Sequence, residues 1–300
     1  MTLVSIVIPT RNRRQLLPET IATVLAQRFT RWELIVVDDG SLDDTPSYLQ
    51  SITDPRVRSI RLEISEGASG ARNAGLALAR GAFCMFLDDD DLLRGDALGM
   101  LCTALSAHPA ALAASGACRL FHEDGNSSRV YRPARASVRR IWREVLFGWW
   151  SNSGQNLFRT SVVREIGGFD VTLRAAEDRQ LWLDVARRGV VCLVPDVVLE
   201  YRQHPHQMPK GDDVERARQL VWSRFVESLP AGQQAEGRRI RRAATLTAQA
   251  EAARARGAFL MATTRQVRAL LAAPQLLLSP LLARPLWWTL KKSLLRRAVP

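Results

Sequence analysis

Over its first 110 residues the chain alternates short, nearly continuous apolar runs with segments in which apolar residues recur every three to four positions. The first pattern predicts strands that are buried on both faces, and the second predicts helices that pack against them. The predicted strands cover residues 3–9, 32–40, 56–62 and 82–87, and the predicted helices cover residues 14–27, 43–52, 66–81 and 97–107. This order predicts an α/β fold with a Rossmann-like, mostly parallel sheet flanked by helices.

The pattern weakens after residue 110. Residues 110–121 could form another strand and residues 125–136 an exposed loop, and a helix is expected to begin near Asp178. Residues 190–207 are expected to form two short strands separated at residues 195–196, where a proline interrupts the apolar run.

Charge is unevenly distributed along the 300 residues. Residues 215–300 contain 16 of the 42 lysines and arginines but 4 of the 30 aspartates and glutamates, so this segment carries the whole formal net charge of +12. No acidic residue follows Glu251. The preceding residues are balanced, which argues against a body that binds nucleic acid through its charge.

The four cysteines, Cys84, Cys102, Cys118 and Cys192, are widely spaced and fall in apolar runs without a CxxC motif. We therefore expect reduced thiols in the core of a cytoplasmic protein. The N-terminal apolar run lacks a preceding basic segment and stops at Pro9, which is too short for a signal peptide. It is expected to be the first buried strand.

Aspartates cluster after two of the predicted strands. Asp38 and Asp39 follow the second strand, and Asp88–Asp91 follow the fourth. Parallel strands end at one edge of a sheet, where α/β proteins bind ligands. Adjacent carboxylates repel one another, and a divalent cation such as Mn²⁺ or Mg²⁺ would offset that repulsion. We expect Asp90 to bind the metal and Asp88 to support the metal or a ribose.

Simpler interpretations stay open at this point. Either cluster could be a solvated loop, and Asp89 and Asp91 could cap the following helix. Asp178 could be a helix cap rather than a base, and His204 a structural histidine rather than a ligand. The segment GASGARNAG lacks the GxGxxG spacing of a dinucleotide site, but its glycines allow close approach and Arg72 could reach a base or phosphate.

Five segments together resemble the family 2 glycosyltransferases of the GT-A fold, over about residues 3–205. They occur in the order VSIVIPTRNR, ELIVVDDGSLDDT, GASGARNAGL, FLDDDD and AEDRQLWL. The resemblance implies an enzyme that transfers a sugar from a nucleotide-diphosphate donor, usually with inversion at the anomeric carbon. It implies a catalytic domain at 1–213, with a nucleotide-sugar-binding half at 1–110 and an acceptor-binding half at 111–213.

The resemblance also implies roles for single residues. Those in the nucleotide-sugar site would be Pro9, Thr10, Arg11, Asp39, Arg72, Asp88 and Asp89. Among them, Thr10 and Asp39 correspond to nucleoside contacts and Arg72 to a base contact. Asp90 and Asp88 correspond to the DxD pair that binds the metal. His204 resembles a late histidine that in some relatives reaches the metal or the diphosphate.

Asp178 corresponds to the family's general base, which takes the proton of an acceptor hydroxyl as its oxygen attacks the anomeric carbon. The chain lacks the QxxRW element of processive synthases, so one sugar per encounter is expected. Residues 147–156 should border the acceptor, with Trp149, Trp150 and Glu177 on that side; core packing is the alternative for the tryptophans. A UDP-sugar donor and a saccharide or lipid-linked acceptor of cell-surface polysaccharide synthesis are expected.

Residues 214–300 are expected to form a basic helical region. Its longest run without a charge, residues 269–283, contains two prolines and is too short to span a bilayer. Residues 284–297 combine tryptophan and leucine with lysine and arginine, as in an interfacial helix on an anionic membrane. We expect peripheral attachment to the inner face of the cytoplasmic membrane; packing on the body or in a homo-oligomer is the alternative.

Three other functions are compatible with parts of the sequence. A non-catalytic nucleotide-sugar-binding relative would keep the fold, but the intact Asp88, Asp90 and Asp178 argue against it. A nucleotidyltransferase would also need a metal and a nucleotide, yet no basic phosphate-binding signature lies near the first strand. A protein that binds nucleic acid through its tail would show salt-sensitive affinity and would leave the aspartates unexplained.

Overall fold

The computed structural model describes residues 2–122, 130–131, 133, 135–148, 152–204 and 211–275. Its helices and strands follow one another as β1 Val4–Thr10, α1 Leu17–Leu25, β2 Trp32–Asp38, α2 Thr45–Gln50, β3 Val57–Arg61, α3 Gly67–Leu78, β4 Phe83–Phe86, β5 Leu92–Leu93, α4 Ala97–Ala107, β6 Ala111–His122, β7 Val130–Tyr131, β8 Ser137–Arg139, α5 Trp142–Phe147, the 3₁₀ turn η1 Ser153–Gln155, β9 Asn156–Arg159, α6 Thr160–Ile166, α7 Glu177–Arg188, β10 Val190–Gln203, α8 Asp212–Ser228, α9 Ala231–Ala255 and α10 Phe259–Ala272.

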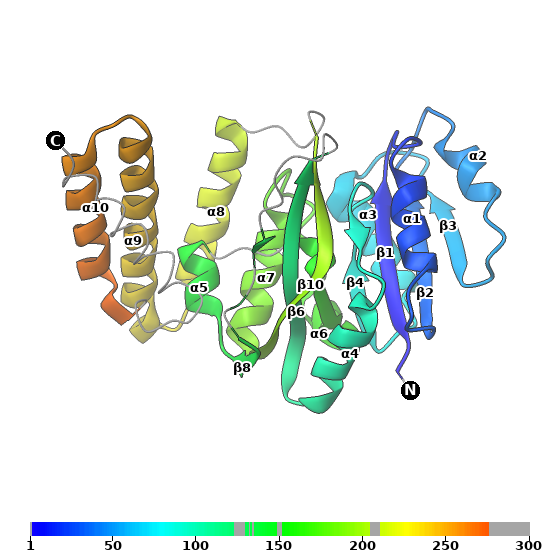
Figure 1. Cartoon of the computed structure of the whole chain (residues 1–300), viewed down its shortest axis with the longest axis horizontal. Coiled ribbons are helices and arrows are strands. Elements are labelled where there is room, and N and C mark those ends of the chain that lie inside the picture. The colour runs from blue at the N-terminus through cyan, green and yellow to red at the C-terminus, as the bar shows by residue number, and fades with distance from the viewer. Residues whose placement is uncertain are drawn as a thin grey trace. The chain divides into compact units, whose positions relative to one another are not determined.

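One sheet runs through the N-terminal part of the protein in the order β3-β2-β1-β4-β9-β6-β10-β5 (Figure 1). Strands β3, β2, β1 and β4 are parallel, and so are β6 and β10. Strand β9 runs antiparallel to both of its neighbours, β4 and β6, and joins the two parallel parts. The expected α/β class, with a central sheet flanked by helices, is confirmed.

The central strands are apolar on both faces because both faces are covered. Ile6 and Ile8 of β1 belong to a buried cluster that also contains Ile21 of α1 and apolar residues of α4. Val7, between them, points to the opposite face. There α3 packs so closely that a Cβ on Gly75 would lie 2.3 Å from Val7 Cγ1. Glycine at this position therefore lets α3 approach the sheet.

The chain divides into two compact units. The N-terminal unit contains residues 1–140 and 151–218, and the C-terminal unit contains residues 141–150 and 219–300. The C-terminal unit includes α5, the end of α8, α9 and α10. Within the described residues, no helix combines the length and the apolarity that crossing a membrane requires.

Several local predictions are confirmed and others are wrong. The helix at 97–107 has the expected ends, whereas the first helix begins at Leu17 rather than at residue 14. Residues 190–203 form one strand, β10, and not two. Its pairing with β6 shifts register around residues 193–199, so bulges absorb the proline without ending the strand. The four cysteines are buried with free thiols, as expected for core residues.

Candidate active site

The predicted site residues come from segments that meet at one edge of the sheet. Strands β1, β2 and β4 are parallel neighbours, so their carboxyl ends lie side by side. These ends carry Thr10, then Asp39, then Asp88–Asp91. The start of α7 and the end of β10 add carboxylates and His204 through the contacts described below.

Arg72 of α3 connects two of these segments. Its Nη2 donates to Asp88 Oδ1 and its Nη1 donates to Glu177 Oε1, both at 2.7 Å. The guanidinium is buried, with 7% of its side chain exposed, and lies 5.2 Å from the centre of the Phe169 ring. Arg72 thus fixes the start of α7 next to the aspartate segment. The predicted contact of Arg72 with a nucleotide base stays a prediction.

Asp90 and His204 converge at the end of β10. Asp90 Oδ2 and His204 Nε2 lie 3.0 Å apart, and both side chains are largely buried. Arg202, two residues earlier, donates from Nε to the carbonyl oxygen of Asp90 at 2.9 Å. Arg202 also forms an ion pair with Glu19 of α1. The backbone that carries Asp90 is therefore held from β10 and from α1.

Asp91 does not cap the next helix, contrary to one sequence interpretation. Asp96 occupies the position before α4, and Asp91 is completely buried. Its Oδ1 accepts a hydrogen bond of 3.0 Å from the backbone N–H of Arg202. Burial, together with the charges of Asp88 and Asp90, raises the pKa of Asp91 well above its ordinary value. Asp91 links the aspartate segment to β10.

Asp89 faces the end of β1. Burial raises its pKa to about 7, while the Thr10 hydroxyl and the charge of Arg13 act in the opposite direction. The value of about 7 already includes repulsion from the neighbouring Asp90 and Asp88, which acts in the same direction as burial. An additional positive charge nearby would stabilise the ionised form of this carboxyl group.

Asp39 organises the loop that opens α3. Its carboxylate accepts hydrogen bonds from the Ser65 hydroxyl at 2.7 Å and from the backbone N–H groups of Glu66 and Gly67 at 2.7 and 3.0 Å. Arg11 donates to the same Ser65 hydroxyl at 2.9 Å. Asp39 therefore holds the loop before α3 in place, and the nucleoside contacts of Thr10 and Asp39 stay predictions.

Helix α7 begins with two carboxylates. Ala176 precedes it with φ +63°, a left-handed conformation that costs energy for a residue with a Cβ and is often found at functional sites. Glu177 is buried, and burial raises its pKa although the charge of Arg72 lowers it. Asp178 lies in the first turn rather than in the cap position, and its Oδ1 accepts a hydrogen bond from the Arg179 N–H at 2.7 Å.

Asp178 borders a small recess with an aromatic lining, whose volume of about 10 Å³ has room for one water molecule. The other lining residues are Phe86, Ser153, Asn156, Phe158, Phe169, Leu181 and Trp182. The aromatic rings of this lining are buried and pack against one another, with ring centroids 4.7 to 6.4 Å apart. Asp178 itself is half-buried, and its role as the catalytic base stays a prediction.

The donor chemistry at this edge fits a hard divalent cation. Among the described residues, no group of three or more His, Cys, Asp or Glu side chains is placed to hold a metal ion. Mg²⁺ and Mn²⁺ do not require one, because they take one or two protein ligands and complete their shell with water and phosphate oxygens. Asp90 with His204 provides such a partial set, whereas Asp88 pairs with Arg72 and its predicted metal contact stays a prediction.

The expected acceptor side is only partly described by the structure, and two residues of the site were not indicated by the sequence. Trp149 and Trp150 lie outside the described residues. The segment expected to border the acceptor is divided, since residues 147–148 belong to the C-terminal unit and 152–156 to the N-terminal unit. Sequence analysis missed Arg202 and Glu19, whose pairing joins residues 183 positions apart. The fragment YRQH, with an arginine two residues before His204, was the available signal.

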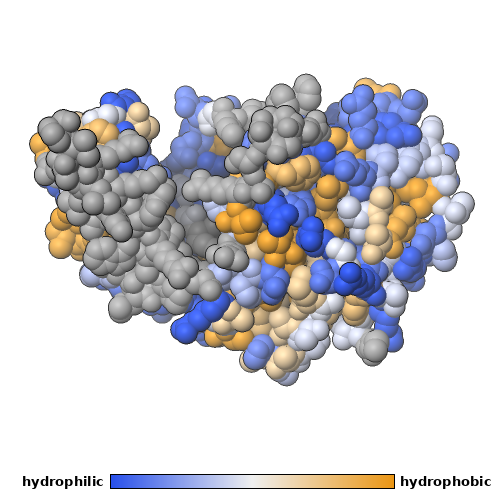
Figure 2. All heavy atoms as spheres, viewed as in Figure 1, coloured by the Kyte–Doolittle hydropathy of each residue, from blue (hydrophilic) through white to orange (hydrophobic). Residues whose placement is uncertain are grey.

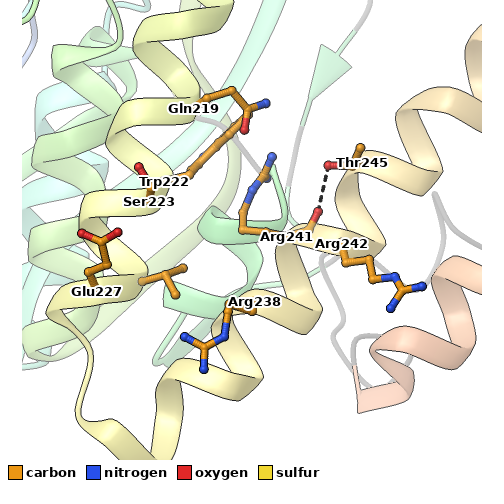
Figure 3. A pocket seen from close by; sticks show the side chains of 9 residues that line it. Gln219, Trp222, Ser223, Glu227, Arg238, Arg241, Arg242 and Thr245 are labelled. Atoms are coloured by element: carbon orange, nitrogen blue, oxygen red, sulfur yellow. Dashed lines mark hydrogen bonds between the residues drawn. The ribbon is translucent and has the colours of Figure 1, made fainter.

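A second cavity, of about 340 Å³, lies in the C-terminal unit between α8 and α9 (Figure 3). Arg241 lines this cavity. Its guanidinium group lies 3.2 Å from the centre of the Trp222 ring and donates a hydrogen bond to the Leu146 carbonyl oxygen at 2.7 Å. The cavity contains none of the predicted site residues. The acidic sheet edge is therefore the candidate active site.

The fold is that of a GT-A glycosyltransferase. A crystal structure of TarS 1–349 from S. aureus in complex with UDP-GlcNAc superposes with a TM-score of 0.68 at 16% identity, covering 97% of this chain and 89% of TarS 1–349. The family model "Glycosyl transferase family 2" matches residues 5–171. The chain belongs to glycosyl transferase family 2.

Two curated relatives are similar over part of the chain. The succinoglycan biosynthesis protein ExoO of Rhizobium meliloti is 37% identical over 201 residues, which are 64% of this chain and 58% of ExoO. WfgD of Escherichia coli, named as a UDP-Glc:alpha-D-GlcNAc-diphosphoundecaprenol beta-1,3-glucosyltransferase, is 40% identical over 98 residues, which are 33% of this chain and 39% of WfgD. The chain thus spans less than two thirds of either relative.

Proposed function

We propose that this chain is an inverting, metal-dependent glycosyltransferase that moves one sugar from a UDP-sugar to a hydroxyl group of a saccharide or lipid-linked acceptor. The family supports the reaction type. TarS binds UDP-GlcNAc, and WfgD is named for a UDP-glucose donor and a diphosphoundecaprenol-linked acceptor, which supports the choice of both substrates. Synthesis of a cell-surface polysaccharide at a membrane fits these relatives.

One observation carries the proposal. Arg72 bridges Asp88 of the aspartate segment and Glu177 at the start of α7, with 2.7 Å to each carboxylate. Because of this bridge, the residues proposed to bind the donor and the residue proposed as base, Asp178, belong to one rigid group. Enzymes gain much of their rate from holding reactants in such fixed geometry.

The chemistry follows from these positions. Asp178 takes the proton from the acceptor hydroxyl as the oxygen forms a bond to the anomeric carbon, on the side opposite to the departing diphosphate oxygen. Attack from that side inverts the configuration. A divalent cation held by Asp90 and His204 would neutralise charge on the departing diphosphate.

Calorimetry of the purified chain against UDP, GDP and dTDP, with and without Mn²⁺, tests the proposed donor site. We expect one nucleoside diphosphate to bind, in the presence of the metal, and Asp90→Ala to abolish that binding. Asp96→Ala is the matched control, because Asp96 is exposed in the same loop region and lies outside the proposed site. Equal binding by the Asp90→Ala variant would overturn the metal assignment.

The released product tests the reaction type. With a UDP-sugar and a saccharide acceptor, the proposal expects release of UDP and a product of inverted anomeric configuration. Release of pyrophosphate would indicate a nucleotidyltransferase instead. Donor binding without any transfer or hydrolysis would indicate a non-catalytic relative.

A further inference from the structure

Arg202, near the end of β10, contacts the aspartate segment in two ways. Its backbone N–H donates to Asp91 Oδ1 at 3.0 Å, and its side-chain Nε donates to the Asp90 carbonyl oxygen at 2.9 Å. The Arg202 side chain is 5% exposed, so water has little access to replace these contacts. One residue therefore holds two consecutive aspartates against the strand.

The rest of the guanidinium group is held by a helix and by a neighbouring strand. Arg202 Nη2 pairs with Glu19 of α1, and the guanidinium carbon lies 5.0 Å from the centre of the Phe121 ring. Phe121 belongs to β6, which lies beside β10 and is paired with it so that Phe121 is opposite Arg202 (Figure 1). The position of the Arg202 side chain is therefore set by α1 and β6, independently of the aspartate segment.

His204 is connected to the same residue through the chain. It follows Arg202 by two positions, so a displacement of the backbone at Arg202 carries His204 with it. His204 Nε2 lies 3.0 Å from Asp90 Oδ2. Arg202 thus acts on both members of this pair, on Asp90 through a hydrogen bond and on His204 through the backbone.

We propose that Arg202 is a positioning residue that holds Asp90 against His204 and thereby sets the affinity of this pair for a divalent cation. Contacts that orient metal ligands from behind change metal affinity by about 10- to 100-fold when they are removed. The effect on the cation rests on the proposed metal-dependent function. The relative position of Asp90 and His204 does not depend on that function.

The proposed role requires the shape of arginine as well as its charge. A guanidinium group presents its donors in a rigid planar fork, so it reaches the Asp90 carbonyl oxygen and Glu19 at the same time. A lysine has one side-chain nitrogen and would satisfy one of these two partners. Because Glu19 is 56% exposed, its pair with Arg202 is partly solvated and should contribute less than the contact with the Asp90 backbone.

Histidine-selective ¹⁵N NMR of the full chain without metal tests the positioning itself. The chain contains four histidines, and the signal of His204 is the one that disappears in His204→Gln. Arg202→Met and Arg202→Lys should both shift the His204 Nε2 signal, because the contact of His204 with Asp90 is lost. Arg202→Lys keeps the positive charge, so it tests the geometry even if Arg202→Met does not fold.

The matched control is Arg159→Met. Arg159 of β9 also donates from Nε to a backbone carbonyl oxygen, that of Ala111, at 2.7 Å. It lies opposite Phe83 at the start of β4, whereas the aspartate segment follows the other end of that strand. Arg159→Met should lower Tm and leave the His204 signal unchanged.

Binding of Mn²⁺ in the presence of UDP, followed by the electron paramagnetic resonance signal of free Mn²⁺, tests the effect on the cation. Arg202→Met and Arg202→Lys should weaken Mn²⁺ binding by about 10-fold or more. Glu19→Gln should weaken it by less than about fivefold, because that pair is partly exposed. Arg159→Met should bind Mn²⁺ like the unchanged protein.

An unshifted His204 signal in both Arg202 variants would overturn the proposal, and so would full Mn²⁺ affinity in Arg202→Lys. An equal loss of Mn²⁺ affinity in Arg159→Met would overturn it as well, since the loss would then follow stability. A shifted His204 signal in a protein that binds no Mn²⁺ would support the positioning of Asp90 and His204 and would overturn the metal-dependent function instead.

Discussion

The two units of the protein differ in how far their arginines pair with carboxylates. In the N-terminal unit, buried arginines pair with carboxylates: Arg72 with Asp88 and Glu177, and Arg202 with Glu19. In the C-terminal unit, one arginine, Arg143, pairs with a carboxylate, that of Glu236, while Arg241 lies on an aromatic ring. Arg238 and Arg242 are exposed and form no ion pair with any described residue. Ion pairs in a buried setting fix geometry, whereas exposed arginines produce a positive surface.

This difference explains the charge asymmetry of the sequence. The N-terminal unit needs acidic residues for its site and compensates them with arginines that also hold the acidic segments in place. The described residues of the C-terminal unit show no acidic cluster of this kind, and the arginines of this unit have few acidic partners. Arginine therefore fixes the positions of acidic segments in the N-terminal unit, and it produces a positive surface on the C-terminal unit.

The largest expected effect concerns the carboxylate that this pairing places at the recess. Asp178→Asn keeps the shape of the side chain but removes the base, so we expect kcat to fall about 10²- to 10⁴-fold. Nucleotide binding should be retained, because Asp178 is not among the proposed donor contacts. Steady-state transfer assays and calorimetry measure the two quantities.

The matched control for this change is Asp184→Asn, on the same helix. Asp184 is paired with Arg187 and Arg188 and lies away from the recess. Its substitution should leave kcat within about twofold. Equal activity of the Asp178→Asn variant and the unchanged enzyme would show that another group is the base.

A second prediction tests the bridge itself. Arg72→Met should reduce the free energy of unfolding by about 3–5 kcal/mol, because Glu177 would remain as a buried charge without its partner. The double variant Arg72→Met/Glu177→Gln should recover part of this loss, since neither charge then remains alone. Chemical denaturation measures both. Additive losses in the double variant would contradict a coupled pair.

The local pattern of the sequence predicted the elements that form the parallel part of the sheet and the edge at which the acidic residues meet. Both follow from regular rules, since apolar runs become buried strands and parallel strands end at one edge. The Arg72 bridge joins positions 105 residues apart, and no local pattern contains such a pairing.

Three further features were beyond the sequence pattern for related reasons. Strand β9 lies antiparallel between β4 and β6. This placement depends on packing between segments that are far apart in the sequence, which a local pattern does not contain. A proline predicted a break in β10, but bulges accommodate it. The sequence of α10 contains apolar residues on several sides of the helix, so it does not indicate which of them are exposed. The packing of one side on α9 determines which apolar side chains remain exposed. Figure 2 shows hydrophobic surface at the edge that α10 occupies in Figure 1. The membrane contact predicted for residues 284–297 falls outside the described residues and stays a prediction.

A smaller effect is expected at Glu33 in β2, another carboxylate that arginine compensates. Burial alone would raise its pKa, but hydrogen bonds from the Ser5 hydroxyl and from Arg80 outweigh it and hold the pKa below its ordinary value. A lowered pKa stabilises the fold above the unfolded-state pKa, and this stability is lost as the pH falls through the folded-state value.

Glu33→Gln should therefore lower the free energy of unfolding by about 1–2 kcal/mol at pH 7. The difference from the unchanged protein should shrink as the pH falls below about 4.5, the ordinary value for glutamate. Denaturation curves between pH 3 and pH 7 measure it. A difference that is constant over this range would show that the carboxylate contributes through packing rather than through its charge.

The smallest effect, and one of opposite sign, is expected in α9. Arg238 and Arg242 are four residues apart on this helix, and like charges at that spacing destabilise a helix by about 0.2–0.5 kcal/mol per pair. Arg242→Gln should therefore raise the free energy of unfolding by a few tenths of a kcal/mol at low salt. The gain should disappear in about 1 M NaCl, where the charges are screened. If Arg242→Gln instead destabilised the protein as strongly as Arg72→Met, the arginines of the two units would not differ in the way proposed.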